Sequence, residues 1–151
     1  DQEKKDKNFY KDIMLYFAFG SNLNRKQIKR RCKNSRFISR HILKNYQLVF
    51  RSKYGAADIQ RKKGSSVLGA IYDINKTDEK KLDAYEEFPK VYVKKYFKIW
   101  GKKVMFYYMS NKTKQTEPSR RYLSSIIQGY KDCGYKDSHI LVLRARRTKA
   151  R

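Results

Sequence analysis

The sequence predicts one α+β domain, in which a small mixed β-barrel or strongly curled sheet is flanked by helices. The chain has 151 residues, 40% of them hydrophobic and including 13 Tyr and 8 Phe, which is enough for one substantial core. Apolar runs of strand length outnumber helical patterns, as is typical of sheet-based domains covered by a few helices. We therefore expect a domain over residues 13–135, between a charged arm at 1–12 and a basic tail at 136–151.

The first element is an apolar strand over residues 13–19, which ends abruptly at Gly20-Ser21-Asn22. These residue types favour turns and local hydrogen bonds. A basic helix over 25–32 follows at once. A tight loop between a strand and a helix directs several backbone N–H groups to one side, where they hold a carboxylate, a phosphate or an oxyanion. The alternative is a plain turn in which Asn22 or Asn24 caps the helix.

The middle of the chain alternates strands and turns. Strand character runs over 37–50, and a small-residue segment at 54–59 suits close packing beside a pocket. A basic turn is expected at 61–64. The strand at 67–74 is almost continuously apolar, so we expect it at the centre of the sheet.

The remaining elements are two helices and a hairpin. Thr77 is expected to cap a helix over 78–87, which Pro89 ends. Strands over 91–100 and 103–109 form a hairpin joined at Gly101-Lys102. The last helix begins at Pro118-Ser119 and ends at Gly134; its apolar residues at helical spacing are Tyr122, Leu123, Ile126, Ile127 and Tyr130.

The charge of the chain indicates a polyanionic partner. There are 38 Lys and Arg against 14 Asp and Glu, a formal net charge of +24. RNA is the commonest polyanion that such proteins bind. The alternative is a well-solvated surface in a lysine-rich proteome. The RNA-binding candidates are Arg25, Lys26, Lys29, Arg30, Arg31, Lys33, Arg36, Arg61, Lys62, Lys63, Arg144, Arg146 and Arg147.

The cysteine and histidine patterns predict neither a metal site nor a disulfide. Cys32 and Cys133 match no metal or redox spacing, and His41 and His139 form no metal pair. We expect free thiols in a reducing compartment, either the cytoplasm or the mitochondrial matrix. No apolar run approaches the roughly 20 residues that a membrane span needs.

Glu86 is the strongest candidate for acid–base chemistry. It lies four residues after Leu82, so in a helix the two share one face, and Leu82 is the residue most suited to the core. Burial raises the pKa of a carboxylate towards the range of a general base. Asp83 and Glu87 lie on the other face beside lysines and look like solvated acids. The alternative for Glu86 is a surface ion pair.

Several short stretches match one known family in the same order along residues 14–134. Residues 16–23 read Y-F-A-F-G-S-N-L, where the family has Y-F-A-Y-G-S-N-L, and residues 82–89 read L-D-A-Y-E-E-F-P, where it has L-D-x-Y-E-G-Y-P. Its G-x-A-D-I and V-x-G-x-x-Y elements are similar to residues 55–59 and 67–72, and Tyr92 and the P-S-R-R-Y at 118–122 match further positions. The chain thus resembles the gamma-glutamylcyclotransferase, AIG2-like family.

The resemblance implies a barrel of six or seven strands and the conversion of a γ-glutamyl amine or peptide to 5-oxoproline with release of the amine. It implies no metal and no cofactor. Glu86 would be the general acid/base, and the loop of Phe19, Gly20, Ser21, Asn22 and Leu23 would bind the substrate, with Tyr92 and Tyr122 lining the pocket.

Two residues depart from the family pattern. Phe19 stands where the family has Tyr, and Glu87 stands where it has Gly. Together with the charge, they leave a second hypothesis open. In it, the same fold is a basic component of a ribonucleoprotein, such as a ribosomal or mitoribosomal subunit, with reduced or lost activity. Segments 1–12 and 144–151 would then thread into RNA or neighbouring proteins.

Overall fold

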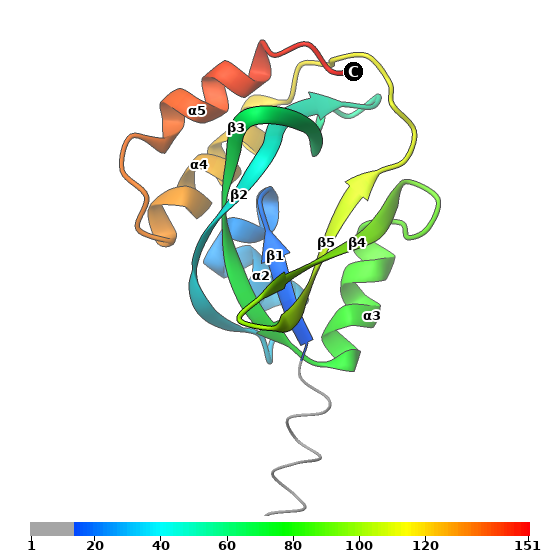
Figure 1. Ribbon diagram of the computed structural model, residues 1–151, viewed down its shortest axis with the longest axis vertical. Coiled ribbons are helices and arrows are strands. Elements are labelled where there is room, and N and C mark those ends of the chain that lie inside the picture. The colour runs from blue at the N-terminus through cyan, green and yellow to red at the C-terminus, as the bar shows by residue number, and fades with distance from the viewer. Residues whose placement is uncertain (1–13) are drawn as a thin grey trace, which may run out of the picture.

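The computed structural model describes residues 14–151, so the predicted arm at 1–12 and the start of the first strand lie outside the described residues. One five-stranded mixed sheet has the order β2-β3-β1-β5-β4 (Figure 1). The strands are β1 (Met14–Ala18), β2 (Arg36–Arg51), β3 (Ala56–Ile74), β4 (Tyr92–Ile99) and β5 (Lys102–Met109). The helices are α2 (Arg25–Arg31), α3 (Lys76–Tyr85), α4 (Arg120–Asp132) and α5 (Ser138–Arg146), with a 3₁₀ turn η1 at Ser21–Leu23.

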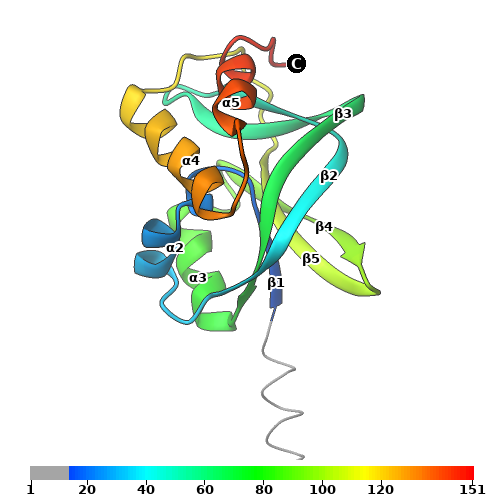
Figure 2. The ribbon, with the colours of Figure 1, turned by 90° about the vertical axis from the view of Figure 1, so that its left-hand side faces the viewer.

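The α+β class with flanking helices is confirmed, and the sheet is curled but open. Over residues 14–151 the strands β2 and β4 form its two edges, so the five strands do not close into a barrel. The barrel of six or seven strands implied by the resemblance is therefore absent from this part of the chain. Helices α2, α3 and α4 lie on one side of the sheet (Figure 2).

The long ribbon of β2 and β3 gives the sheet its curl. Its register shifts between Lys44 and Tyr46, where Asn45 adopts a φ of 67° and Gly64 opposite adopts a φ of 86°. The amide N of Gly64 donates to Oδ1 of Asn45 at 3.2 Å. The basic turn predicted at 61–64 is therefore wrong. These residues continue β3 through a bend, and the chain reverses instead at Ser52–Gly55, where Gly55 N donates to Ser52 O.

Strand β1 lies at the centre of the sheet. It pairs antiparallel with β3, as Tyr16 opposite Tyr72, and parallel with β5, as Tyr16 opposite Met105. Phe17 and Ala18 are fully buried, and so is Ile71 in the predicted central strand. Because β1 and β5 are parallel, their carboxyl ends reach the same edge of the sheet.

Helix α3 begins earlier than expected. Asn75, and not Thr77, is its cap: Oδ1 of Asn75 accepts from Asp78 N at 2.8 Å and Oδ2 of Asp78 accepts from Asn75 N at 3.3 Å. This reciprocal capping box starts the helix at Lys76. The helix ends at Tyr85, ahead of Pro89, so Glu86 occupies the C-cap position.

The hairpin and the last predicted helix form close to their expected positions. The β4–β5 turn is Trp100–Gly101, with φ values of 52° and 73°, one residue before the predicted turn. Ser119 caps α4 by accepting a hydrogen bond from Tyr122 N at 3.1 Å, and Gly134 follows its end with a φ of 86°.

The segment 136–151 is not an extended tail. It contains α5, which packs on α4 and β2 because Val142 and Ala145 are buried. Beyond α5 the chain returns to the β2–β3 ribbon, where Arg151 N donates to Oε1 of Gln60 at 2.8 Å. None of the helices in residues 14–151 has the length and apolar character needed to span a membrane.

Candidate active site

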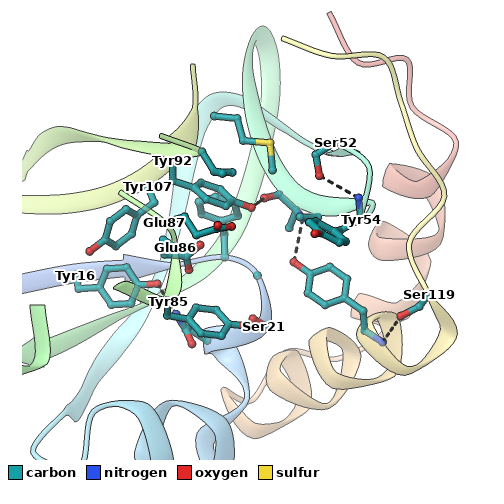
Figure 3. Close-up of a pocket in the computed structure, with 18 residues that line it drawn as sticks. Tyr16, Ser21, Ser52, Tyr54, Tyr85, Glu86, Glu87, Tyr92, Tyr107 and Ser119 are labelled. Atoms are coloured by element: carbon teal, nitrogen blue, oxygen red, sulfur yellow. Dashed lines mark hydrogen bonds between the residues drawn. The ribbon is translucent and has the colours of Figure 1, made fainter. Parts of the chain in front are cut away.

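A cavity of about 530 Å³ opens at the edge of the sheet where β1 and β5 end. It is enclosed by the loop after β1, the start of β3, the segment after α3 and the start of α4 (Figure 3). Of the predicted substrate-binding residues, Phe19, Gly20, Ser21, Asn22, Tyr92 and Tyr122 line it, together with Glu86. Leu23 does not line the cavity, because its side chain is fully buried in the core.

The loop after β1 turns sharply beneath the cavity. Leu23 N donates to Gly20 O at 3.0 Å and Asn24 N donates to Ser21 O at 3.1 Å, which forms the 3₁₀ turn η1. The backbone N–H groups of Ser21 and Asn22 donate to no acceptor within residues 14–151. Unpaired N–H groups beside a cavity are suited to an anionic ligand atom.

Helix α4 packs against the loop after β1. Gly129 allows the contact, since a Cβ there would lie 2.5 Å from the backbone N of Asn24. Asn24 caps α2 through Oδ1, which accepts from Gln27 N at 3.1 Å. Asn24 is therefore the capping residue, and the side chain of Asn22 makes its hydrogen bonds within the site. Its Nδ2 donates to the hydroxyl of Tyr16 at 3.0 Å.

Glu86 projects into the cavity from the end of α3 (Figure 3). Its backbone N donates to Leu82 O at 2.8 Å, so the last helical turn still orients it relative to the buried Leu82. The carboxyl group is largely enclosed by protein and only partly exposed. Burial raises its pKa to about 7, against the opposing effect of the Arg31 charge. A carboxyl group with this pKa accepts and returns protons at neutral pH.

Arg31 contacts three residues that line this cavity, whereas its role in RNA binding stays a prediction. Its guanidinium stacks 3.2 Å from the centroid of the Tyr85 ring. Its Nη1 donates to Oδ1 of Asn22 at 2.5 Å and to Oγ of Ser21 at 3.3 Å. Arg31 thereby fixes the loop after β1 and places a positive charge near Glu86.

The tyrosines of the site differ in what their hydroxyl groups do. Tyr92 donates to Ala57 O at 2.7 Å, whereas Tyr122 accepts from Ala57 N at 3.0 Å. Burial raises the pKa of Tyr16, Tyr92 and Tyr122 far above the ordinary value, so all three remain neutral. Tyr16 and Tyr107 lie edge to face, with ring centroids 5.9 Å apart.

The two acidic residues on either side of Glu86, both expected to be solvated, have different surroundings. Asp83 is not a solvated acid, because it accepts from the Tyr107 hydroxyl at 2.6 Å and from Lys94 Nζ at 2.9 Å. Glu87 is exposed at the cavity and has a φ of 50°, a left-handed conformation that favours glycine. This backbone angle explains why Gly suits the position in the family pattern.

Sequence reasoning missed several residues of the site. Tyr16 and Tyr107 come from β1 and β5, and only their parallel pairing brings the two together. Tyr85 directly precedes Glu86 and carries the stacked Arg31. Other lining residues are Ser52, Tyr54, Ala56, Ala57, Val91, Met109 and Ser119. The quoted motifs contained Tyr16, Ala56, Ala57, Tyr85 and Ser119, so motif membership was the available signal for these five.

The remaining RNA-binding candidates lie away from the cavity lining. Arg36 pairs with Asp73 at 2.7 Å and Arg146 pairs with Glu117 at 3.1 Å. The exposed candidates are Arg25, Lys26, Lys29, Arg30, Lys33, Arg36, Arg61, Lys62, Lys63, Arg144 and Arg147. Cys32 and Cys133 are buried free thiols, and residues 14–151 contain no group of three or more His, Cys, Asp or Glu arranged to hold a metal ion.

The sequence of this chain matches one known protein family. A sequence model described as gamma-glutamyl cyclotransferase, AIG2-like matches residues 16–125. The chain belongs to this family. The match covers the loop after β1, Glu86, Tyr92 and Tyr122, so the cavity described above lies within the family domain.

Solved structures agree with this membership. A gamma-glutamyl cyclotransferase is 26% identical, with a TM-score of 0.74 over 88% of this chain and 87% of that one. An uncharacterized protein from Homo sapiens is 28% identical, with a TM-score of 0.74 over 89% and 88%. YkqA from Bacillus subtilis, 18% identical with a TM-score of 0.75 over 97% of this chain and 59% of that one, shares the fold. Comparison with curated protein sequences gave no significant match.

Proposed function

We propose that the protein is an active γ-glutamylcyclotransferase that converts a γ-glutamyl amine or peptide to 5-oxoproline and releases the amine. The observation that carries this proposal is the position of Glu86. A carboxyl group whose pKa is raised to about 7 by burial faces a cavity that Ser21 and Asn22 also line, and the backbone N–H groups of these two residues have no acceptor within residues 14–151. Intramolecular acyl transfer uses two kinds of group, a proton acceptor for the attacking amine and N–H donors for the developing oxyanion. Glu86 and the loop after β1 would supply them.

In the proposed reaction, Glu86 takes a proton from the α-amino group of the substrate. The amine nitrogen then attacks the γ-carbonyl carbon of the same molecule and forms the C–N bond of a five-membered lactam. The protonated Glu86 returns the proton to the leaving amine as the original γ-amide C–N bond breaks. The ring nitrogen, which began as an α-ammonium group, still carries one proton too many for a lactam and passes it to the released amine through the freed Glu86 carboxylate. The α-ammonium group thus loses two protons, the released amine gains two, and no water is consumed. Because both reacting groups belong to one molecule held in place, proximity lowers the barrier.

The loop after β1 supports this chemistry through its free donors. The N–H groups of Ser21 and Asn22 would hold the α-carboxylate or the developing oxyanion of the substrate. Tyr122 is the third donor that we assign. Its oxygen accepts from Ala57 N, which leaves its own O–H free within the described residues. The Tyr92 hydroxyl donates its proton to Ala57 O, so Tyr92 would contribute to the cavity as a lining residue and not as a donor to the substrate.

The test of the proposal is Glu86→Gln, with release of 5-oxoproline from γ-glutamyl peptides followed by mass spectrometry. Glutamine keeps the size of the side chain but cannot accept the proton, so we expect turnover to fall at least about a hundredfold, within the usual contribution of a general base. Glu87→Gln is the matched control, since it removes the neighbouring carboxylate at the mouth of the cavity. Equal turnover by Glu86→Gln and the wild type would refute the assignment.

A second candidate function is RNA binding as a component of a ribonucleoprotein. The observation that favours it is the run Arg61, Lys62 and Lys63, all exposed on β3 in a chain of net charge +24. Changing these three residues to Gln is expected to weaken binding to RNA. The affinity of the variant should also fall less steeply than that of the wild type as salt is raised from about 50 to 200 mM. A control with the same loss of charge changes the exposed Lys80, Lys81 and Lys90. Equal RNA affinity of the two triple variants would refute a specific role for β3.

A further inference from the structure

The β4–β5 hairpin presents exposed aromatic rings and uncompensated positive charge to solvent. Trp100, at its turn, is 72% exposed, and Tyr96 on β4 is 43% exposed. Residues 92–109, which form the hairpin, include no Asp or Glu. Four exposed lysines of the hairpin form no ion pair with a carboxylate in residues 14–151: Lys95, Lys98, Lys102 and Lys103.

The stability of the fold does not explain these residues. Lys98 and Lys103 are direct partners across the hairpin, and like charges in directly opposite positions destabilise a strand pair. Trp100 has a φ of 52°, a left-handed conformation that hairpin turns usually assign to Asn, Asp or Gly. Its exposed ring gains little from burial in return. A bound anion that stacks on the indole would offset both costs.

The curl of the sheet brings this hairpin next to the basic run on β3. Arg61 Cζ and Lys95 Nζ each lie 5.7 Å from the centroid of the Tyr46 ring on β2. Lys95 Nζ also donates to the Tyr46 hydroxyl at 3.1 Å and lies 5.9 Å from the centroid of the Tyr108 ring. Cations and aromatic rings therefore alternate from β3 across β2 to the hairpin. The bend of the β2–β3 ribbon and the turn of the hairpin both lie on the side away from α2, α3 and α4 (Figure 2).

Strands β2 to β5 have no free carboxylate that could neutralise these cations. Their acidic residues are Asp58 and Asp73, and both are buried. Asp58 pairs with Arg51 at 2.9 Å, and Asp73 pairs with Arg36 at 2.7 Å. The surface formed by Arg61, Tyr46 and the exposed residues of the hairpin, here called the hairpin face, is therefore complementary to a polyanion.

We propose that the hairpin face binds single-stranded nucleic acid. The lysines and Arg61 contact phosphates, and Trp100 and Tyr96 stack on unpaired bases. A duplex offers the same phosphates but keeps its bases stacked on one another, so it binds more weakly. The inference rests on the second candidate function, RNA binding, to which it adds the surface and the preference for unpaired strands. It does not depend on the cyclotransferase reaction.

The first test uses the fluorescence of Trp100, which is the single tryptophan of the chain. A single-stranded RNA oligonucleotide of mixed sequence should quench this emission, because a stacked base quenches the indole. The DNA strand of the same sequence should do so as well. The RNA annealed to its complement should bind at least about fivefold more weakly, the contribution of one stacked base. Vesicles of phosphatidylcholine and phosphatidylserine should leave the emission unchanged.

The second test measures the affinity of variants for the same dye-labelled single strand by anisotropy. Trp100→Ala should lower the affinity at least about fivefold, whereas Trp100→Phe keeps a ring and most of the affinity. Lys98→Gln/Lys103→Gln should also weaken binding, yet leave the protein no less stable to urea, because it removes a repelling pair. The control Lys80→Gln/Lys81→Gln removes the same charge from exposed positions of α3 and should weaken binding less.

The outcomes separate the hairpin face from RNA binding in general. Equal affinity for single strand and duplex, unchanged affinity of Trp100→Ala, or equal losses in the two lysine variants would each overturn the hairpin face and leave RNA binding elsewhere on the chain intact. A blue shift of the emission on vesicles, without quenching by RNA, would also overturn it and make the hairpin a membrane contact. If the wild type binds no RNA, the second candidate function fails together with this inference, and release of 5-oxoproline still decides the cyclotransferase reaction.

Discussion

Tyr92 and Tyr122 bind opposite sides of one backbone residue, Ala57. The Tyr92 hydroxyl donates to the carbonyl oxygen of Ala57 at 2.7 Å, and the Tyr122 hydroxyl accepts from its amide N at 3.0 Å. Both side chains line the candidate active site. The two tyrosines therefore differ chemically, because the proton of Tyr92 is already used and that of Tyr122 is available to a ligand.

This difference predicts different effects of the two Tyr-to-Phe changes. Either variant leaves a backbone group of Ala57 without its partner, so each should lower the free energy of unfolding by about 1–3 kcal/mol. Tyr122→Phe should in addition lower kcat/KM for 5-oxoproline formation by about tenfold, as expected when one donor to the substrate is lost. Urea unfolding and initial rates measured on both variants check this. Equal losses of turnover in the two would show that Tyr122 is not a donor.

The raised pKa of Glu86 predicts a pH dependence of both rate and stability. Burial raises this pKa from 4.5 to about 7, so the ionised base becomes available, and kcat/KM should increase, as the pH rises through about 7. Between these two values the folded state binds more protons than the unfolded state. Stability contributed by the protonated carboxyl is therefore present below about 4.5 and is lost as the pH rises through about 7.

The measurement for this prediction is a pair of thermal unfolding series, for the wild type and for Glu86→Gln, from pH 4.5 to 8. Glutamine does not titrate, so the variant should gain Tm relative to the wild type as the pH rises across this range. A constant difference between the wild type and Glu86→Gln would contradict the raised pKa.

Glu87 predicts a stabilising substitution. Its φ of 50° is left-handed, a conformation that costs an ordinary residue about 1–2 kcal/mol. Glycine removes this cost but adds about 0.5–1 kcal/mol of conformational freedom to the unfolded chain. We therefore expect Glu87→Gly to raise the free energy of unfolding by up to about 1.5 kcal/mol, the largest difference between these two ranges.

Glu87→Ala is the matched control, because it removes the carboxylate but keeps the strained backbone. It should give no such gain in stability in urea unfolding. If Gly and Ala stabilise the protein equally, the carboxylate and not the backbone angle is the cause. A change in turnover common to both variants would likewise be assigned to the carboxylate at the mouth of the cavity.

The sequence predicted the elements of this fold better than their arrangement. Local signals placed the loop at Gly20 and the turn after α4 at Gly134, because both depend on neighbours along the chain. Lys63 was misplaced in a turn, since the bend in β3 arises from Gly64 acting together with Asn45 on the other strand. Such cross-strand pairing leaves no local pattern.

The same limit applies to the site. Glu86 was correctly directed towards the interior by its spacing from Leu82, although it caps α3 and does not lie within the helix. Arg31 was assigned to a charged surface because its own segment is uniformly basic. Its contacts with Asn22 and Tyr85 depend on how α2 meets α3, which spacing along the chain does not reveal.

A buried ion pair behind the cavity gives the last prediction. Arg51 Nε lies 2.9 Å from Oδ2 of Asp58, and both side chains are fully buried. Oδ1 of Asp58 also accepts from the backbone N of Met109, which lines the candidate active site. Removing one partner leaves an uncompensated buried charge, so Asp58→Ala should lower the free energy of unfolding by about 3–5 kcal/mol.

The exposed pair of Arg146 and Glu117, 3.1 Å apart, supplies the comparison for this last change. Glu117 is 64% exposed, so water screens the pair and Glu117→Ala should cost at most about 1 kcal/mol. Urea unfolding of the two variants measures the contrast. Similar small losses in both would mean that the Arg51 charge is compensated by its other acceptors, the backbone oxygens of Thr113 and Arg151 and the side chain of Gln60. A large loss confined to Asp58→Ala would instead make this carboxylate the group that holds β2, β3 and the end of β5 together beneath the cavity.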